Sequence, residues 1–97
     1  MNFTSVGARR YLNNTEVLYT SLGDTVNGII MVIESTTGYS ALYRIEAGTL
    51  SAVSANTNFS TTKGTTSHYN LYFEDSHLRL QNLVGDNKTL EVLFSGS

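Results

Sequence analysis

Residues 67–97 read SHYNLYFEDSHLRLQNLVGDNKTLEVLFSGS, and this stretch decides the fold class. Apolar side chains alternate with polar ones in three runs, at residues 69–74, 77–81 and 89–94. Successive side chains of a β-strand point to opposite faces of a sheet, so a period of two predicts strands with one apolar and one polar face. The stretch therefore predicts a three-stranded antiparallel meander at the C-terminal end of an all-β domain.

The turn between the first two runs predicts how they pair. If Asp75 and Ser76 form a two-residue hairpin loop, Leu71 lies opposite Leu80, so that apolar side chains meet on one face. A slip of one residue would move every side chain to the other face, which makes this register the favoured one. On the polar face, the expected pairs are Asn70 with Gln81, Tyr72 with Arg79, and Glu74 with His77.

A second turn, at residues 85–87, predicts where the third run lies. A three-residue loop needs a left-handed conformation at its last position, which Asn87 tolerates better than most residues. Such a loop places Leu80 opposite Val92. All three strands of the meander are then expected in one sheet.

The rest of the chain predicts more strands of the same kind. The 97 residues suffice for a single domain over residues 1–97, and Ser, Thr and Asn supply 33 of them, which suits β-structure. Residues 29–33 are apolar on both faces, which predicts a buried central strand. Turn signals recur at the spacing of sandwiches and barrels, so we expect an antiparallel β-sandwich or jelly roll of roughly seven to nine strands.

Composition and motifs argue against several classes of function. The net charge of −2 comes without a basic patch, so we expect no nucleic-acid partner. Residues 29–33 are too short to cross a membrane, and residues 1–14 lack the apolar run of a secretory signal. No catalytic motif is present, and His77 beside Glu74 would supply only two metal ligands. We therefore expect no enzyme, no metal, no cofactor and synthesis in the cytoplasm without a signal peptide.

The polar face of the predicted meander is the candidate binding site. Its amides, carboxylates, guanidinium group and aromatic ring are the groups that recognise a sugar or a polar epitope. The residues are Asn70, Tyr72, Glu74, His77, Arg79, Gln81 and Glu91. The same face reads equally well as an ordinary solvated surface, or as a subunit interface that includes Leu83 and Leu93. The Ser- and Thr-rich segment 54–68 is favoured as a crossover rather than a binding loop.

Two stretches resemble a known group of proteins. One is RYLNNT at residues 10–15, and the other is LRLQN at residues 78–82, followed by a Gly-Asp-Asn turn and the run 90–94. Together they resemble C-terminal modules of bacteriophage tail-fibre, tail-spike and baseplate-associated proteins. The resemblance implies a small antiparallel β-sandwich that forms a homotrimer and binds host-surface glycans. It assigns no role to any single residue.

The resemblance leads to one expected function with two alternatives. We expect a virion structural module, namely a receptor-binding fibre-tip domain that belongs to a longer fibre protein or stands alone. One alternative is a capsid or tail structural protein that serves assembly without binding a ligand. The other is a carbohydrate-binding module attached to an enzyme.

Overall fold

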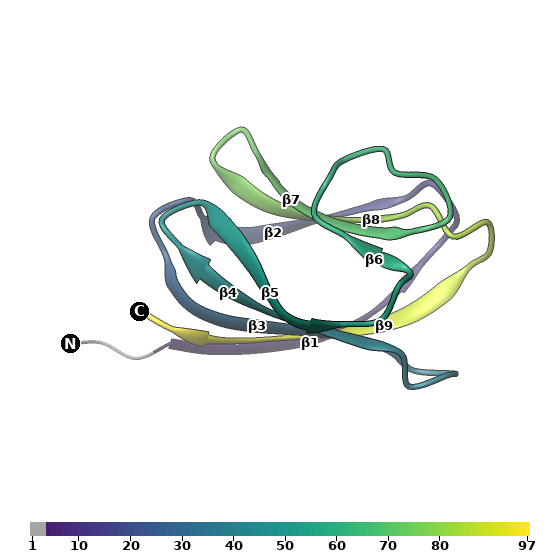
Figure 1. The fold of residues 1–97 in the computed structure, drawn as a ribbon, viewed down its shortest axis with the longest axis horizontal. Coiled ribbons are helices and arrows are strands. Elements are labelled where there is room, and N and C mark those ends of the chain that lie inside the picture. The colour runs from purple at the N-terminus through teal and green to yellow at the C-terminus, as the bar shows by residue number, and fades with distance from the viewer. Residues whose placement is uncertain (1–3) are drawn as a thin grey trace.

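The computed structural model describes residues 4–97, which fold into two packed β-sheets (Figure 1). The nine strands are β1 (Thr4–Leu12), β2 (Val17–Gly23), β3 (Asn27–Glu34), β4 (Ser40–Glu46), β5 (Thr49–Ala55), β6 (Phe59–Ser60), β7 (Tyr69–Glu74), β8 (His77–Asn82) and β9 (Lys88–Gly96). One sheet has five strands in the order β1-β9-β3-β4-β5, and the other has four in the order β2-β8-β7-β6. The predicted all-β sandwich is confirmed, and among the strand pairs of residues 4–97 only the short β6–β7 pair is parallel.

The β7–β8 hairpin has the predicted register. Leu71 lies opposite Leu80, and the polar pairs follow as expected. Asp75 and Ser76 have φ values of 52° and 64°. Two left-handed residues in succession form the turn type whose twist matches that of the flanking strands, so the local sequence fixes this hairpin.

The predicted meander is wrong at its third strand. β9 does not pair with β8 but lies between β1 and β3 in the other sheet, where Val92 is opposite Ala8 and Val32. The cause lies at the corner after β8. Asn82 is fully buried, and its Nδ2 donates hydrogen bonds to the carbonyl oxygens of Leu12 and Asp86, at 3.1 and 2.8 Å. These bonds fix the crossing of the chain from one sheet to the other.

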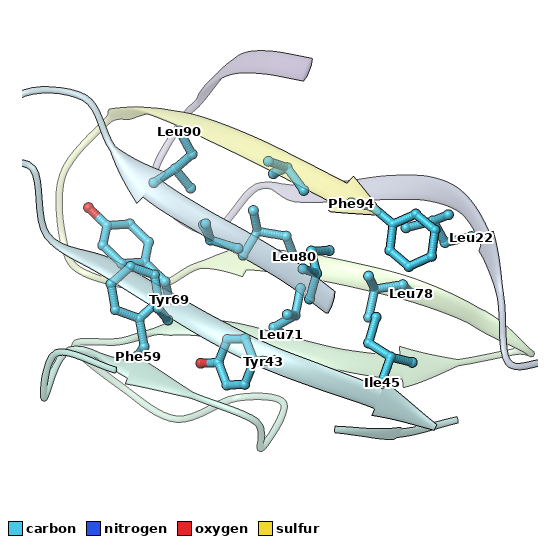
Figure 2. Close-up of a cluster of buried hydrophobic side chains, with 14 of the residues drawn as sticks. Leu22, Tyr43, Ile45, Phe59, Tyr69, Leu71, Leu78, Leu80, Leu90 and Phe94 are labelled. Carbon is cyan, nitrogen blue, oxygen red and sulfur yellow. The ribbon is translucent and has the colours of Figure 1, made fainter. Parts of the chain in front are cut away.

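The core lies between the inner faces of the two sheets (Figure 2). Leu71, Leu78 and Leu80 of the four-stranded sheet are at most 1% exposed. From the five-stranded sheet, the buried apolar side chains are Leu12, Ile30, Val32, Ala41, Tyr43, Ile45, Leu90, Val92 and Phe94. The inward direction of residues 90, 92 and 94 therefore follows the predicted alternation, although their strand partners differ. Each fully buried leucine contributes about 1.5–3 kcal/mol relative to an exposed one.

Strand β3 is central in its sheet, as predicted, but only one of its faces is covered. Ile30 and Val32 point into the core and are 0% exposed, whereas Ile29 is 49% exposed. No element of residues 4–97 packs on the outer side of this sheet (Figure 1). An apolar strand face thus remains open to solvent in the single chain.

Candidate functional site

The outer face of the four-stranded sheet carries a row of aromatic and cationic side chains. Tyr19 of β2 lies opposite Arg79 of β8, which in turn lies opposite Tyr72 of β7. The guanidinium carbon of Arg79 lies 4.5 Å from the centroid of the Tyr19 ring, and Lys63 Nζ lies 5.9 Å from the centroid of the Tyr72 ring. Both distances are within the range of cation–π attraction. We call Tyr19, Lys63, Tyr72 and Arg79 the outer platform.

The two tyrosines of the outer platform differ sharply in exposure. Tyr19 is 68% exposed, whereas Tyr72 is only 6% exposed. The sequence predicted an exposed Tyr72, and this is wrong because Lys63 and its loop lie over the ring. Burial raises the pKa of the Tyr72 phenol, while the nearby charge of Lys63 acts to lower it. The ring that remains open for a ligand is that of Tyr19.

Residues 61–66 form a loop that lies over this outer face and seals part of it. The Gly64 N–H donates to Gln81 Oε1 at 2.9 Å. Asn70 Nδ2 donates to the Thr65 carbonyl oxygen at 3.0 Å and to Gln81 Oε1 at 3.1 Å. Asn70 is 0% exposed. Asn70 was expected to contact a ligand, but it is buried and its side chain holds the loop instead. Gln81 also holds the loop and is half-buried, so its contact with a ligand stays a prediction.

The loop belongs to the segment 54–68, which crosses between the two sheets. β5 ends at the edge of the five-stranded sheet, and β6 begins at the edge of the four-stranded sheet. The favoured reading of this segment as a crossover therefore agrees with the chain path. It also supplies Lys63 to the outer platform, so part of it borders the candidate site.

Glu74 and His77 lie at the end of the hairpin, beside the outer platform. Glu74 forms an ion pair with Lys63. A hydrogen bond from the ammonium group to this carboxylate raises the pKa of Lys63, against a smaller opposite effect of desolvation. His77 is exposed, and its Nδ1 lies 3.0 Å from the Asp75 carbonyl oxygen. Both side chains therefore remain accessible at the rim of the platform.

Arg79 has one buried nitrogen without a partner. Its Nε makes no hydrogen bond among residues 4–97. Buried N–H groups are nearly always paired with protein, water or ligand. A ligand oxygen, or a water molecule, beside the Tyr19–Arg79 stack would supply the missing acceptor.

A hollow of about 290 Å³ opens on the other side of Tyr19, between the edges of β1 and β2. Arg10, Thr20 and Ser21 contribute polar groups to its wall, while Val92 lies at its apolar floor. Thr20 Oγ1 donates to the Leu78 carbonyl oxygen at 2.9 Å and is thereby fixed. Tyr19 thus contacts the Arg79 guanidinium group and also lines a hollow whose surface is mostly apolar.

Glu91 does not belong to this surface. It lies on β9, in the five-stranded sheet, where its carboxylate accepts a hydrogen bond from Arg9 at 2.9 Å. The sequence placed Glu91 on the same polar face as Arg79 because it assumed that β9 pairs with β8. The crossing between sheets separates these two side chains.

Leu83 and Leu93 do not share a surface either. Leu83 is half-buried in the β8–β9 connection, where its backbone exchanges hydrogen bonds with Ser67 and His68 at 2.8 and 3.0 Å. Leu93 is 44% exposed on the outer face of the five-stranded sheet. The prediction that Leu93 lies on the polar face of the meander is wrong for the same reason as for Glu91.

Leu93 belongs to an apolar surface that the sequence did not predict. It lies opposite Met31, which lies opposite Leu42, and Ile29 is the next outward residue of β3. We call Ile29, Met31, Leu42 and Leu93 the bare face. A hollow of about 350 Å³ opens among these side chains.

Two residues of the outer platform were also missed, namely Tyr19 and Lys63. No local pattern shows that β2 pairs with β8, because their contact is made between distant parts of the chain. Leu18 packs against the core while Tyr19 is exposed, so the alternation along β2 does give the outward direction of Tyr19. Which residues lie beside Tyr19 on the sheet can be read only from the three-dimensional fold.

The side chains of the outer platform can form noncovalent contacts of several kinds. Within residues 4–97, no three His, Cys, Asp or Glu side chains gather as metal ligands. The same residues include no helix long and apolar enough to span a membrane. Aromatic stacking, guanidinium and ammonium donors, and carboxylate acceptors are what the outer platform offers.

Comparisons with known proteins give one distant likeness. No family model matches the chain, and no curated protein matches it. Among solved structures, the chain is similar to part of the tailspike protein of Acinetobacter phage vB_ApiP_P1, with a TM-score of 0.36, 13% identity and 97% of this chain covered. The chain spans 21% of that tailspike chain. A likeness at this level carries no argument about function.

Proposed function

We propose that this chain is a non-enzymatic module of a bacteriophage tail whose outer platform binds a polysaccharide on the host surface. The observation that carries this proposal is Tyr19, a ring that is 68% exposed yet held by Arg79 at 4.5 Å. A fixed, exposed aromatic ring gives a flat apolar surface with little entropy left to lose on binding. The apolar C–H face of a sugar ring is a suitable partner for such a surface.

The groups around Tyr19 match the polar edges of a glycan. Arg79 and Lys63 donate hydrogen bonds, and Glu74 accepts them. Sugar hydroxyls both donate and accept, so they can pair with either kind of group. Arg79 and Glu74 stand on paired strands, which hold them more precisely than a free loop would, and Lys63 lies on a loop that is tied to Gln81.

The phage assignment is supported by the sequence resemblance and by the Ser-, Thr- and Asn-rich composition without cysteine. In this proposal the module is part of the virion and faces the outside of the particle. The proposed state is a homotrimer, because tail-fibre modules that resemble this chain are trimeric.

A matched pair of tyrosine variants tests the platform. Tyr11 is 62% exposed on β1, nearly as open as Tyr19, but it lies in the other sheet. An array of bacterial surface polysaccharides is screened with the unaltered chain, and each hit is titrated with Tyr19→Ala and Tyr11→Ala. We expect Tyr19→Ala to weaken binding by about tenfold or more, equivalent to about 1.4 kcal/mol, and Tyr11→Ala to leave it unchanged. Equal effects of the two variants, or no bound polysaccharide, would overturn the proposal.

A second candidate function is assembly without ligand binding, as in a capsid or tail structural protein. The observation that favours it is the bare face, where Ile29 and Leu93 are 49% and 44% exposed. The proposed occupant is a second copy of this chain. The Arg9–Glu91 and Arg44–Glu46 pairs stand on the same sheet as this surface, so each copy presents both signs of charge to the other.

The oligomeric state tests this second candidate and the proposed homotrimer together. Light scattering at high micromolar concentration should give three times the mass of one chain, and Leu93→Ser should shift the balance toward monomers. A monomeric unaltered chain would contradict both the homotrimer and the use of the bare face between copies.

A carbohydrate-binding module attached to an enzyme would use the same platform. What distinguishes it is the gene context. A glycosidase on the same polypeptide would favour the attached module, whereas neighbouring tail genes would favour the phage reading.

A further inference from the structure

A third hollow opens at the edge of the sandwich away from Tyr19, between β5 and β6. Its volume is about 390 Å³, at the small end of ligand pockets, which span roughly 300–1,000 Å³. β5 is the last strand of the five-stranded sheet and β6 the last of the four-stranded sheet, so the hollow lies where the two sheets are not joined. Its lining residues are Tyr43, Ala52, Ala55, Phe59, Ser60, Thr61, Thr65 and His68.

The Tyr43 hydroxyl is the unusual group in this hollow. The residue is only 1% exposed, and its hydroxyl makes no hydrogen bond within residues 4–97. Figure 2 shows the hydroxyl directed away from Ile45, on the side of the core where Phe59 lies. A buried hydroxyl without a partner costs free energy, so a group that pairs with it is strongly favoured. Burial also raises the pKa of this phenol, which keeps the hydroxyl protonated and able to donate.

The polar wall of the hollow is held in place by its own hydrogen bonds. Ser60 Oγ and Thr65 Oγ1 lie 3.2 Å apart, and the Thr62 N–H donates to Ser60 Oγ at 3.0 Å. His68 Nδ1 lies 2.6 Å from the Thr66 carbonyl oxygen. Since a carbonyl oxygen only accepts, the Nδ1–H of His68 donates in this contact. The wall is therefore prearranged before any ligand binds.

The groups in this hollow indicate the class of ligand. Four hydroxyl side chains line it, no Lys, Arg, Asp or Glu does, and Phe59 and two alanines give it an apolar part. Charged ligands would find no counter-charge, and wholly apolar ligands would leave the Tyr43 hydroxyl unpaired. A neutral sugar ring has both hydroxyl groups and apolar C–H groups, and so satisfies each part of the lining.

We propose that this hollow is a subsite for one neutral monosaccharide unit, in which a sugar oxygen accepts a hydrogen bond from Tyr43. This inference rests on the proposed glycan-binding function and adds a position to it, at the edge opposite β2. The outer platform and this subsite are then two separate contacts, one with an exposed ring and one with a buried hydroxyl. Two such contacts on one polymer would strengthen its binding beyond either alone.

The test uses single sugars and the intact chain. Glucose, galactose and N-acetylglucosamine are titrated separately to high millimolar concentration while backbone amide signals are followed by NMR. At least one sugar should shift the amides of Ser60, Thr61 and Thr65. Tyr43→Phe should weaken that binding about fivefold, the effect of one neutral hydrogen bond. Because the lost hydroxyl has no partner in the free chain, this variant should be at least as stable as the unaltered one.

Tyr69→Phe is the matched control. Tyr69 is 2% exposed, but it is not among the residues that line this hollow, so its loss of a hydroxyl should leave sugar binding unchanged. The absence of shifts with all three sugars would overturn the subsite, as would equal affinity in Tyr43→Phe and the unaltered chain. Tyr19→Ala leaves this readout intact, so failure of the outer platform and failure of the subsite give different results.

Discussion

The two outer faces of the sandwich differ in what lies on them. The face of the four-stranded sheet is partly covered by residues 61–66, which bury Tyr72 and leave Tyr19 as a fixed exposed ring. The face of the five-stranded sheet has no such cover, and Ile29 and Leu93 remain about half exposed. A face that the chain itself has organised offers preformed polar and aromatic contacts to a ligand, whereas a bare apolar face gains mostly from excluding water against another protein.

The largest expected effect is a difference in stability between substitutions on the inner and on the outer side of β9. Leu90 and Leu93 both lie on β9, but Leu90 is 0% exposed and Leu93 is 44% exposed. Leu90→Ala should lower the free energy of unfolding by about 2–5 kcal/mol, because it leaves a cavity in the core. Leu93→Ala should cost less than about 1 kcal/mol in a dilute, monomeric sample. Urea denaturation of both variants measures the difference, and large, equal losses would show that the bare face is covered in solution.

A smaller expected effect on stability tests whether residues 61–66 are held over the outer face of the four-stranded sheet. Gln81 Oε1 accepts hydrogen bonds from Gly64 and Asn70, so Gln81→Ala should cost about 1–2 kcal/mol and loosen the loop. Hydrogen exchange at the Gly64 amide should become faster. His77→Ala, on the same strand but exposed at the turn, should change neither quantity. If exchange at Gly64 is the same in all three chains, residues 61–66 are not held by this contact.

The sequence predicts the parts of this fold that depend on neighbouring residues. The β7–β8 register follows from the turn at Asp75 and Ser76, and the inward direction of Leu90, Val92 and Phe94 follows from their alternation. The partner of β9 does not follow from such patterns. It depends on the buried Asn82 at the corner, whose hydrogen bonds reach the end of β1.

The sequence predicts only part of the candidate site, because here too it gives local features and not the contacts between distant segments. Arg79, Glu74 and His77 lie where the hairpin places them, and they remain accessible or half-buried. Tyr72 is covered by a loop that shows no period in the sequence, and Tyr19 joins the surface through a strand from the other end of the chain. Local alternation gives the direction of a side chain, but it does not give what covers that side chain or lies beside it.

The smallest expected effect is on the pH dependence of stability. It is tested by comparing the buried Glu34 of the five-stranded sheet with the half-exposed Glu74 of the four-stranded sheet. Glu34, at the end of β3, is 1% exposed, and it accepts hydrogen bonds from the Thr36 and Thr37 N–H groups at 3.0 and 2.6 Å. Burial alone would raise its pKa, but these bonds and that from the Thr37 hydroxyl bring the pKa below its ordinary value of 4.5. The folded-state pKa is thus lower than the unfolded one. The resulting stabilisation is complete above the unfolded pKa and is lost as the pH falls through the folded-state value.

Thermal unfolding at several pH values between neutral pH and pH 3 measures this contribution. Glu34→Gln should be less stable than the unaltered chain at neutral pH. The difference in melting temperature between the two chains should become smaller as the pH falls. Glu74→Gln, at the half-exposed ion pair with Lys63, should cost less than about 1 kcal/mol at neutral pH. If the difference in melting temperature stays constant with pH, the hydrogen bonds of Glu34 do not depend on the negative charge of its carboxylate.

The most direct test of the central claim is to find which outer face a polysaccharide contacts. A polysaccharide that binds on the array is titrated into the isotopically labelled chain, and the backbone amide signals are followed by NMR. We predict shifts at Tyr19, Lys63 and Arg79, and none at Ile29 or Leu93. Shifts confined to Ile29 and Leu93, with the amides of the outer platform unchanged, would contradict the account.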